Sequence, residues 1–173
     1  MFVLGIDPGV SRCGYGCVRR TGGRLEAVCA GVLTTSPAEA LPRRLRRLGD
    51  EMAVLLDELA PEVVAVERVF FQTNVRTAMS VGQASGLALA AAERAGCRVV
   101  EYTANEVKQA VAGYGSADKG QMQRMVQLLL GLAELPSPPD AADALALAIC
   151  HLSAAPLLAG IEAATGAPRG GGS

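Results

Sequence analysis

The chain opens with Phe2-Val3-Leu4-Gly5-Ile6-Asp7-Pro8-Gly9, an apolar run that stops at an acid and a turn sequence. The apolar run predicts a buried strand, and Asp-Pro-Gly is good turn chemistry. A second run, Val63-Val64-Ala65-Val66, also ends in an acid, Glu67. Acids are poor core residues, so two acids that close buried strands indicate a functional role. Taken alone, Asp7 is explained equally well as a turn residue.

Further strands are predicted around these two runs. Hairpin signals indicate strands at 14–20 and 25–33, and another apolar run indicates a strand at 98–102. Hairpin-linked strands followed by strands that alternate with helices predict an α/β fold, a five-stranded mixed sheet with helices on both faces. A crossover should place the 63–67 strand beside the first strand. Asp7 and Glu67 would then be neighbours at the carboxyl ends of parallel strands.

Five helices are predicted from apolar periodicity and end signals. The first has a capping-box pattern at 36–39 but contains Pro42, where the helix could instead restart, and it ends before Pro61. The others are predicted at 75–95, 104–111, 119–130 and from Ser137-Pro138-Pro139 to about Leu158. We expect one domain over 1–160 and a disordered Gly-rich tail over 161–173.

Two more acids lie one turn apart at the start of the last predicted helix. Asp143 interrupts the apolar run Ala141-Ala142-Asp143-Ala144-Leu145, whereas Asp140 alone could merely complement the helix dipole. Residues three apart face the same side of a helix, with Cβ atoms roughly 5–6 Å apart. Clustered carboxylates repel one another, and hard cations take oxygen ligands. The four acids together therefore favour a pair of divalent metal ions.

Composition limits the classes of protein that the chain can represent. The 173 residues carry a formal net charge of −1, which permits a nucleic-acid partner only through a local basic surface. No apolar stretch is long enough to span a membrane, and no signal peptide is expected. The five cysteines form no CxxC pair, which suits free thiols in a reducing cytoplasm.

Several segments, taken together, resemble the RuvC family of Holliday junction resolvases, members of the RNase H-like nuclease superfamily. Their order and spacing, from about residue 2 to His151, make a chance match improbable. The segments are Gly5-Ile6-Asp7-Pro8-Gly9, Glu67-Arg68-Val69-Phe70, Val81-Gly82-Gln83-Ala84, Glu101-Tyr102, Val107-Lys108-Gln109, Gly113-Tyr114-Gly115-Ser116-Ala117-Asp118-Lys119 and Asp140-Ala141-Ala142-Asp143-Ala144-Leu145-Ala146.

The resemblance implies an RNase H-like, Mg²⁺-dependent endodeoxyribonuclease. By position, Asp7, Glu67, Asp140 and Asp143 match the metal-binding and catalytic acids of the family. Two Mg²⁺ ions per subunit, for which Mn²⁺ can substitute, would clamp the scissile phosphate, activate water and stabilise the leaving oxygen. The expected products carry 5′-phosphate and 3′-hydroxyl ends. Paired symmetric nicks would resolve four-way junctions in homologous recombination and DNA repair.

The resemblance also implies DNA-binding residues and partners. Lys108 and Lys119 match basic residues implicated in DNA contact and catalysis, and Phe70 matches an aromatic residue that contacts junction bases. The implied partners are four-way junction DNA, a second copy of the chain in a homodimer, and the branch-migration proteins RuvA and RuvB. One departure is Ser85, where a basic residue is more usual, and this puts one DNA-backbone contact in doubt.

Other residues allow more than one interpretation. The helix at 75–95 is rich in small residues, which suits a dimer contact and packing on its own sheet equally well. The basic run Arg43 to Arg47 is more typical of a solvated helix face than of a DNA site. On an extended segment, Phe70 and Phe71 would point in opposite directions, so we expect only one of them to be free for a base. Cys150 and His151 are adjacent on a helix and do not face each other, which argues against a nucleophile pair.

Three rival functions remain to be compared with a resolvase. An actin-like ATPase or sugar kinase shares a glycine-containing loop after its first strand but needs a second lobe and a second phosphate loop. A DNA-binding module that has lost activity would not need all four acids. An RNase H-like nuclease for another branched substrate is disfavoured by the Phe70, Lys108 and Lys119 segments, through the resemblance alone.

Overall fold

The five predicted strands form one mixed sheet. The computed structural model describes residues 1–68 and 75–165, with side chains for residues 1–68 and 78–155. The strand order is β3-β2-β1-β4-β5, which confirms the predicted sheet. The strands are β1 (Phe2–Asp7), β2 (Arg12–Thr21), β3 (Arg24–Thr34), β4 (Val63–Glu67) and β5 (Arg98–Tyr102).

The pairing of β1 with β4 brings the first two acids together. β1 pairs antiparallel with β2 and parallel with β4, and Ile6 lies opposite Val66 in the parallel pair. Asp7 and Glu67 follow these two residues directly, so they are neighbours at the carboxyl ends of central strands. The predicted crossover and the predicted proximity of the two acids are both confirmed.

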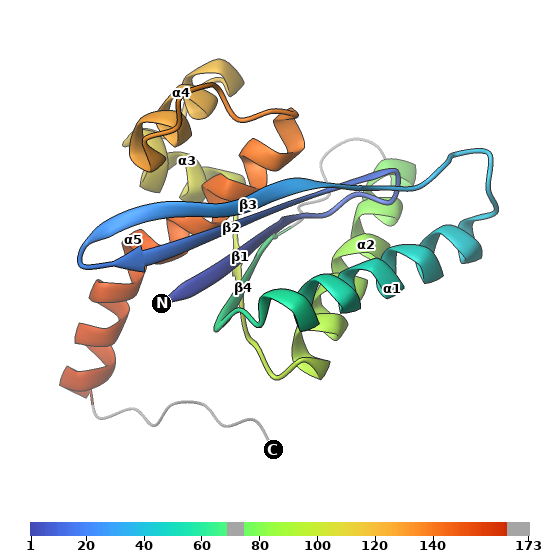
Figure 1. Cartoon of the computed structure of the whole chain (residues 1–173), viewed down its shortest axis with the longest axis horizontal. Coiled ribbons are helices and arrows are strands. Elements are labelled where there is room, and N and C mark those ends of the chain that lie inside the picture. The colour runs from blue at the N-terminus through green and yellow to red at the C-terminus, as the bar shows by residue number, and fades with distance from the viewer. Residues whose placement is uncertain (69–74, 166–173) are drawn as a thin grey trace.

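Helices cover both faces of the sheet (Figure 1). α1 (Leu41–Leu59) and α2 (Val75–Arg94) pack on one face, while α3 (Ala104–Ala112), α4 (Lys119–Leu130) and α5 (Pro139–Thr165) pack on the other. Alternation along β1 divides the core, because Val3 faces the α3–α5 side and Leu4 the α1–α2 side. Both residues are fully buried.

The start of α5 lies very close to the sheet because two strand residues are glycines. A Cβ atom on Gly5 would clash with the carbonyl oxygen of Ala144, and one on Gly14 would clash with the carbonyl oxygen of Asp140. Gly14 is paired with Asp7 across the β1–β2 ladder. The close approach therefore places the first turns of α5 beside the end of β1, where Asp7 lies.

Two predicted helix ends differ from the structure. The first helix does not start at the 36–39 capping box, because Ser36 accepts the Ala38 amide in a local turn (3.3 Å) instead. α1 begins at Leu41 with Ala40 as its cap and Pro42 in its first turn, where proline costs no hydrogen bond. α5 continues beyond the predicted end, to Thr165. The domain boundary at 160 and the disordered tail remain predictions, and residues 166–173 lie outside the described residues.

Candidate metal centre and its cavity

The two strand-end acids share a buried, mutually repulsive environment. Burial, and then the neighbouring charges of Glu67 and Asp143, raise the pKa of Asp7 to about 8. The pKa of Glu67 is also raised, first by burial, although the hydrogen bond from Asp7 acts in the opposite direction. Asp7 therefore keeps its proton near neutral pH and donates it to Glu67 in the metal-free protein.

The two helix acids are each paired with a cation. Arg12 donates from both Nε (3.0 Å) and Nη2 (2.8 Å) to Oδ2 of Asp140. These hydrogen bonds are the main cause that lowers the pKa of the Asp140 carboxyl. Lys119 Nζ lies 3.5 Å from Oδ2 of Asp143. Asp140 and Asp143 thus each contact a basic side chain, Arg12 from β2 and Lys119 from α4.

A cavity of about 330 Å³ opens where the strands end and α3, α4 and α5 meet. Three of the predicted acids, Asp7, Glu67 and Asp143, line it, and so do both predicted lysines, Lys108 and Lys119. The structure therefore gathers five predicted site residues from β1, β4, α3, α4 and α5. Asp140 does not line this cavity.

The acids fit a hard divalent cation, although they are not yet gathered around one point. Within residues 1–68 and 75–165, no three acidic, histidine or cysteine side chains form a group that could already hold a metal ion. Carboxylates repel one another without a cation, and Arg12 and Lys119 hold two of the acids. The donors are all oxygen atoms. The raised pKa of Asp7 reflects burial first and then the neighbouring carboxylates, whose negative potential a cation would relieve.

Lys119 is held at the cavity by the local chemistry of a helix start. It is the first residue of α4, whose cap Asp118 accepts from the Gln121 amide (2.8 Å) in a complete capping box. The Lys119 side chain is 81% exposed, so it is free to reach a ligand in the cavity. Lys108, on α3, is partly buried and also lines the cavity.

Sequence reasoning missed Arg12, which contacts Asp140 directly. The chain after Asp7 turns back to pair Gly14 with Asp7, and Arg12 lies in that return, but no sequence signal links it to Asp140. Phe70 and Phe71, by contrast, lie outside the described residues, so the predicted base contact stays a prediction. Ser85 is buried on α2 and offers no surface contact to a DNA backbone.

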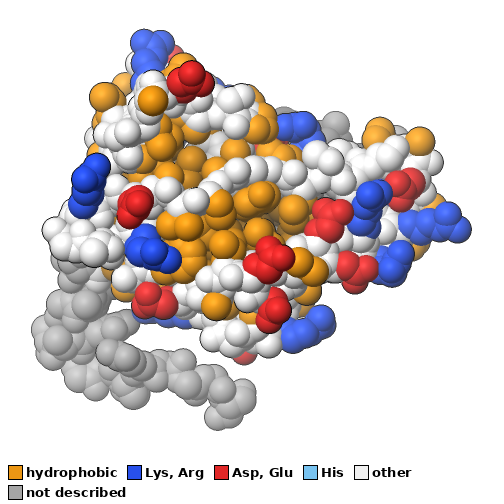
Figure 2. All heavy atoms as spheres, viewed as in Figure 1, with side chains coloured by type: hydrophobic (Ala, Val, Ile, Leu, Met, Phe, Trp, Pro, Cys, Tyr) orange, Lys and Arg blue, Asp and Glu red, His pale blue; other side chains and the backbone are white. Residues whose placement is uncertain are grey.

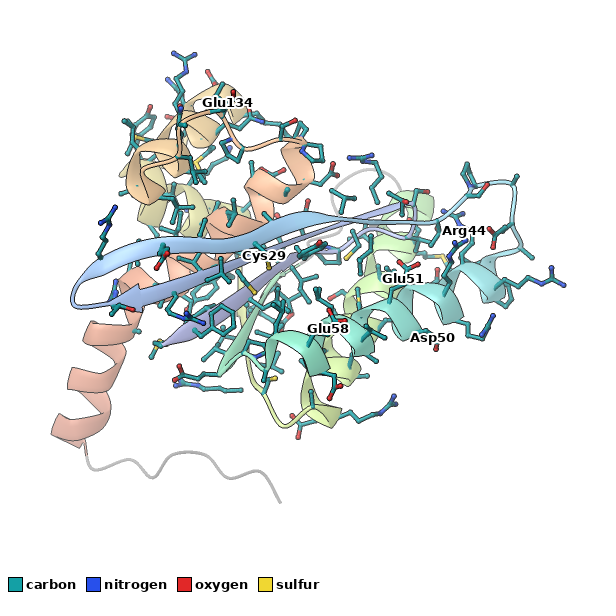
Figure 3. All side chains as sticks on the ribbon, in the orientation of Figure 1. Cys29, Arg44, Asp50, Glu51, Glu58 and Glu134 are labelled. Atoms are coloured by element: carbon teal, nitrogen blue, oxygen red, sulfur yellow. The ribbon has the colours of Figure 1, made fainter. Side chains whose placement is uncertain are left out.

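The basic run on α1 forms ion pairs on a solvated helix face (Figure 3). Arg46 pairs with Asp50 (3.2 Å), and Arg47 pairs with Glu51 (3.3 Å), both one turn apart. Arg44 instead donates to Ser11 Oγ (2.5 Å) in the loop before β2. This arrangement agrees with the expected solvated face.

A second cavity, of about 350 Å³, lies between β3 and α1. Its floor is apolar, with Leu33, Val54 and Leu55, and acids that include Glu58 stand at its border. Figure 2 shows apolar side chains gathered on this face, with both acidic and basic side chains around them. Acids at the border repel phosphate, so this face does not suit DNA.

His151 and Cys150 do not form a nucleophile pair. His151 is fully buried, and its Nδ1 shares a hydrogen bond with the Tyr102 hydroxyl (2.8 Å). Cys150 is directed to the Glu106 carbonyl oxygen (3.8 Å), and burial raises its pKa to about 12. Both residues belong to the packing of α5, which supports the rejection of this pair.

Comparisons with known proteins agree with this architecture. The family model described as "Crossover junction endodeoxyribonuclease RuvC" matches residues 3–151. A Chloroflexus aggregans protein of that name is 54% identical over 158 residues, covering 91% of this chain and 96% of the relative. The Thermus thermophilus RuvC structure superposes with a TM-score of 0.83 at 39% identity, and its complex with Holliday junction substrate with 0.86 at 40%. Both superpositions cover 91% of this chain and 96% of the other.

These matches agree with the observed sheet. The five-stranded mixed sheet agrees with the RuvC structures and confirms the expected RNase H-like fold. The matched region, residues 3–151, includes all four acids and both lysines of the centre. The chain therefore belongs to the RuvC family of crossover junction endodeoxyribonucleases, which are metal-dependent nucleases.

Proposed function

We propose that the protein resolves four-way DNA junctions by paired, symmetric hydrolysis of phosphodiester bonds. Membership of the RuvC family supports the reaction class and the substrate. The observation that carries the proposal is the cavity itself, which Asp7, Glu67 and Asp143 line together with Lys108 and Lys119. Acids suited to cations beside lysines suited to phosphate are the two parts that phosphodiester hydrolysis needs. Junction resolution of this kind belongs to homologous recombination and DNA repair.

The four acids would hold two Mg²⁺ ions, or Mn²⁺ in their place. Bound there, the ions would supply an activated water and stabilise charge on the leaving 3′ oxygen, leaving 5′-phosphate ends. Asp7 and Glu67 anchor the centre to the rigid strands β1 and β4. Asp143 and Asp140 bring it to the first turns of α5. Acids from rigid elements keep the centre in place while DNA binds.

The lysines would act on the DNA rather than on the cations. Lys119 is mobile enough, at 81% exposed, to leave Asp143 for the scissile phosphate and offset charge in the transition state. Lys108 would hold the neighbouring strand at the α3 wall. The Phe70 side chain would hold a junction base by stacking.

Two sites are needed for paired nicks, so we propose a homodimer with α2 at its contact. The expected packing of α2 on its own sheet is present, because Ala84, Ala88 and Ala92 are fully buried. A different side of α2 is open, since a Cβ atom at Gly82 or Gly86 would meet nothing within 4 Å. A two-fold dimer would present two centres to a two-fold junction.

The proposed partners and setting follow from the family. RuvA and RuvB are the proposed branch-migration partners, and the cytoplasm is the proposed location. In the described part of the chain, no helix has the length and apolar character needed to cross a membrane. The five cysteines are all free thiols, as a reducing compartment requires.

The decisive experiment is cleavage of a labelled synthetic four-way junction in Mg²⁺, Mn²⁺ or EDTA, with linear duplex of the same sequence as control. Symmetric, ligatable, metal-dependent nicks confined to the junction would establish a resolvase. Equal cutting of the duplex would indicate a general nuclease. Tight junction binding without cutting in either metal would indicate a binding module.

Phe70 has a separate test because it is proposed to stack on a DNA base rather than to bind metal or phosphate. Phe70→Ala should slow junction cleavage more than it weakens junction binding, because stacking holds a base in place without supplying the chemistry. Single-turnover cleavage and gel-shift affinity measured on the same junction separate the two effects. Unchanged cleavage would remove Phe70 from the site.

A further inference from the structure

The Arg12–Asp140 pair differs from the other ion pairs near the surface. Both donors of Arg12 converge on the single oxygen Oδ2, at 3.0 and 2.8 Å. The Arg46–Asp50 pair on α1 is longer, at 3.2 Å, and its side chains are 76% and 65% exposed. Asp140 is only 27% exposed. Exposed pairs contribute about 1 kcal/mol or less to stability, so this contact between distant parts of the chain calls for another role.

The loop that carries Arg12 is fixed from two directions. The Thr35 hydroxyl donates to the Val10 carbonyl oxygen (2.5 Å), and the Thr35 amide donates to the Ser11 carbonyl oxygen (3.1 Å). Arg44 donates to both Ser11 Oγ and Thr35 Oγ1. The buried Thr35 thus holds residues 10–11, and Arg12 follows directly as the first residue of β2. Its guanidinium is therefore presented to Asp140 from a preorganised position.

Asp140 is equally fixed at its backbone. The glycine at position 14 lets α5 approach so closely that a Cβ atom there would lie 3.1 Å from the Asp140 Cβ atom. With its backbone fixed, the carboxylate can change partners only by rotating its side chain. In the structure that side chain contacts Arg12, and Asp140 does not line the cavity that the other three acids share.

We propose that Arg12 is a positioning residue that holds Asp140 at the edge of the centre in the metal-free protein and yields it to the cation. This inference rests on the proposed metal-binding function of the acids. Arg12 and the cation compete for the same carboxylate, and two positive charges close together repel. Arg12 therefore lowers the affinity of the free protein for metal.

The same charge has the opposite effect on DNA. Without metal, the cavity holds several carboxylates that repel a phosphate backbone, and Arg12 reduces this repulsion. Arg12 should thus favour junction binding before the metal binds and oppose metal binding before the junction binds. Cleavage chemistry would then be favoured on the junction rather than in free solution.

The test measures both affinities in the same intact protein. Mn²⁺ binding without DNA is followed by the EPR signal of free Mn²⁺, and junction binding in EDTA is followed by fluorescence anisotropy. Arg12→Gln is expected to bind Mn²⁺ about tenfold more tightly than the wild type, and the junction about threefold more weakly. Arg12→Lys keeps the charge and should restore both affinities most of the way.

The opposite signs separate this role from a structural one, because a misfolded site would weaken both affinities. Arg46→Gln is the matched control: it removes an arginine from an ion pair on α1, away from the cavity, and should change neither affinity. Mn²⁺ binding by Arg12→Gln that equals or falls below the wild type would overturn the inference. Absence of Mn²⁺ binding by the wild type would instead remove the proposed metal function and this inference with it.

Discussion

The two halves of the acidic centre reduce their mutual repulsion in different ways. On the strand side, Asp7 and Glu67 are partly buried and hydrogen-bond to each other, and burial raises the pKa of both. On the helix side, Asp140 and Asp143 are also partly buried, but each contacts a basic side chain. The strand side keeps a proton on Asp7, whereas on the helix side Arg12 and Lys119 contact the acids.

The difference indicates that the unfavourable burial and repulsion of carboxylates, which a cation would relieve, is greater on the strand side. A carboxyl that is protonated near neutral pH must lose its proton before it coordinates metal, so metal affinity and pH are linked there. On the helix side, a cation would replace the basic side chain that contacts each carboxylate, and no proton has to be lost. Substitutions on the strand side should therefore change both the cleavage rate and the stability of the fold. Substitutions on the helix side should change mainly the cleavage rate and the affinity for metal.

The largest effect is expected for Asp7→Asn. Loss of this carboxylate removes a proposed metal ligand, so cleavage should fall by a factor on the order of 10³ or more, while junction binding stays nearly intact. Asp118→Asn is the matched control, because it makes the same change in the same cavity and asparagine caps a helix as well as aspartate does. Loss of binding equal to the loss of cleavage would contradict the metal role.

Lys119→Gln should have the next largest effect, and on rate alone. The side chain offers a mobile charge to the phosphate, so single-turnover cleavage should slow by about 10- to 100-fold. Stability should change by less than about 0.5 kcal/mol, because the 3.5 Å contact with Asp143 is weak and the lysine is 81% exposed. Lys119→Arg should keep most of the rate. A Lys119→Gln protein with wild-type rate would place the lysine outside the chemistry.

Gly14→Ala tests the close approach of α5 to β2, which brings the helix side of the centre to the strand side. The new methyl group would meet the Asp140 backbone, so α5 must move away from β2 at a cost of about 1–3 kcal/mol. Cleavage should fall as Asp140 and Asp143 move from Asp7. Gly49→Ala is the control: it places a methyl 3.6 Å from Leu87, an ordinary contact, and should be neutral or stabilising. Equal melting temperatures for the two variants would contradict the close approach.

The sequence predicted the strand side of the centre better than the helix side. Asp7 and Glu67 could be placed together because parallel strands have a fixed register, and their apolar runs are unambiguous. The spacing of Asp140 and Asp143 was also clear from the helix period. The basic partners of these two acids could not be predicted from the sequence. The Arg12 contact with Asp140 joins residues 128 positions apart, and the shape of the chain before Arg12 depends on Thr35 and Arg44.

The start of α1 shows a different reason for failure. The Ser36-to-Glu39 pattern has the residues of a capping box, but here they form a separate turn before Ala40. The local pattern correctly predicted that Ser36 accepts a nearby amide, but it placed the helix start too early. Pro42 fits only the first turn of a helix, so α1 has to begin close to it. Tertiary packing of Leu48, Met52 and Leu56 then fixes where α1 lies.

The pH dependence of stability in EDTA separates the two sides of the centre by its sign. The pKa of Asp7 rises from 3.8 in the unfolded chain to about 8 in the folded protein. Between these values the folded state binds a proton that the unfolded state has released, so stability falls as pH rises. Asp7→Asn lacks this loss, and its free energy of unfolding should exceed that of the wild type by an amount that grows steadily from about pH 4 to about pH 8.

Asp140→Asn should show the opposite sign, because Arg12 lowers the pKa of that carboxyl. The stabilisation from this pair is present above the unfolded pKa of 3.8 and is lost as pH falls below it. Urea unfolding in EDTA from about pH 2 to pH 8 would measure both variants against the wild type, because the Asp140 contribution changes only below the unfolded pKa. A stability difference between Asp7→Asn and wild type that is constant with pH would mean that Asp7 is ionised throughout. The strand side would then hold its charge as the helix side does, and the contrast between them would be lost.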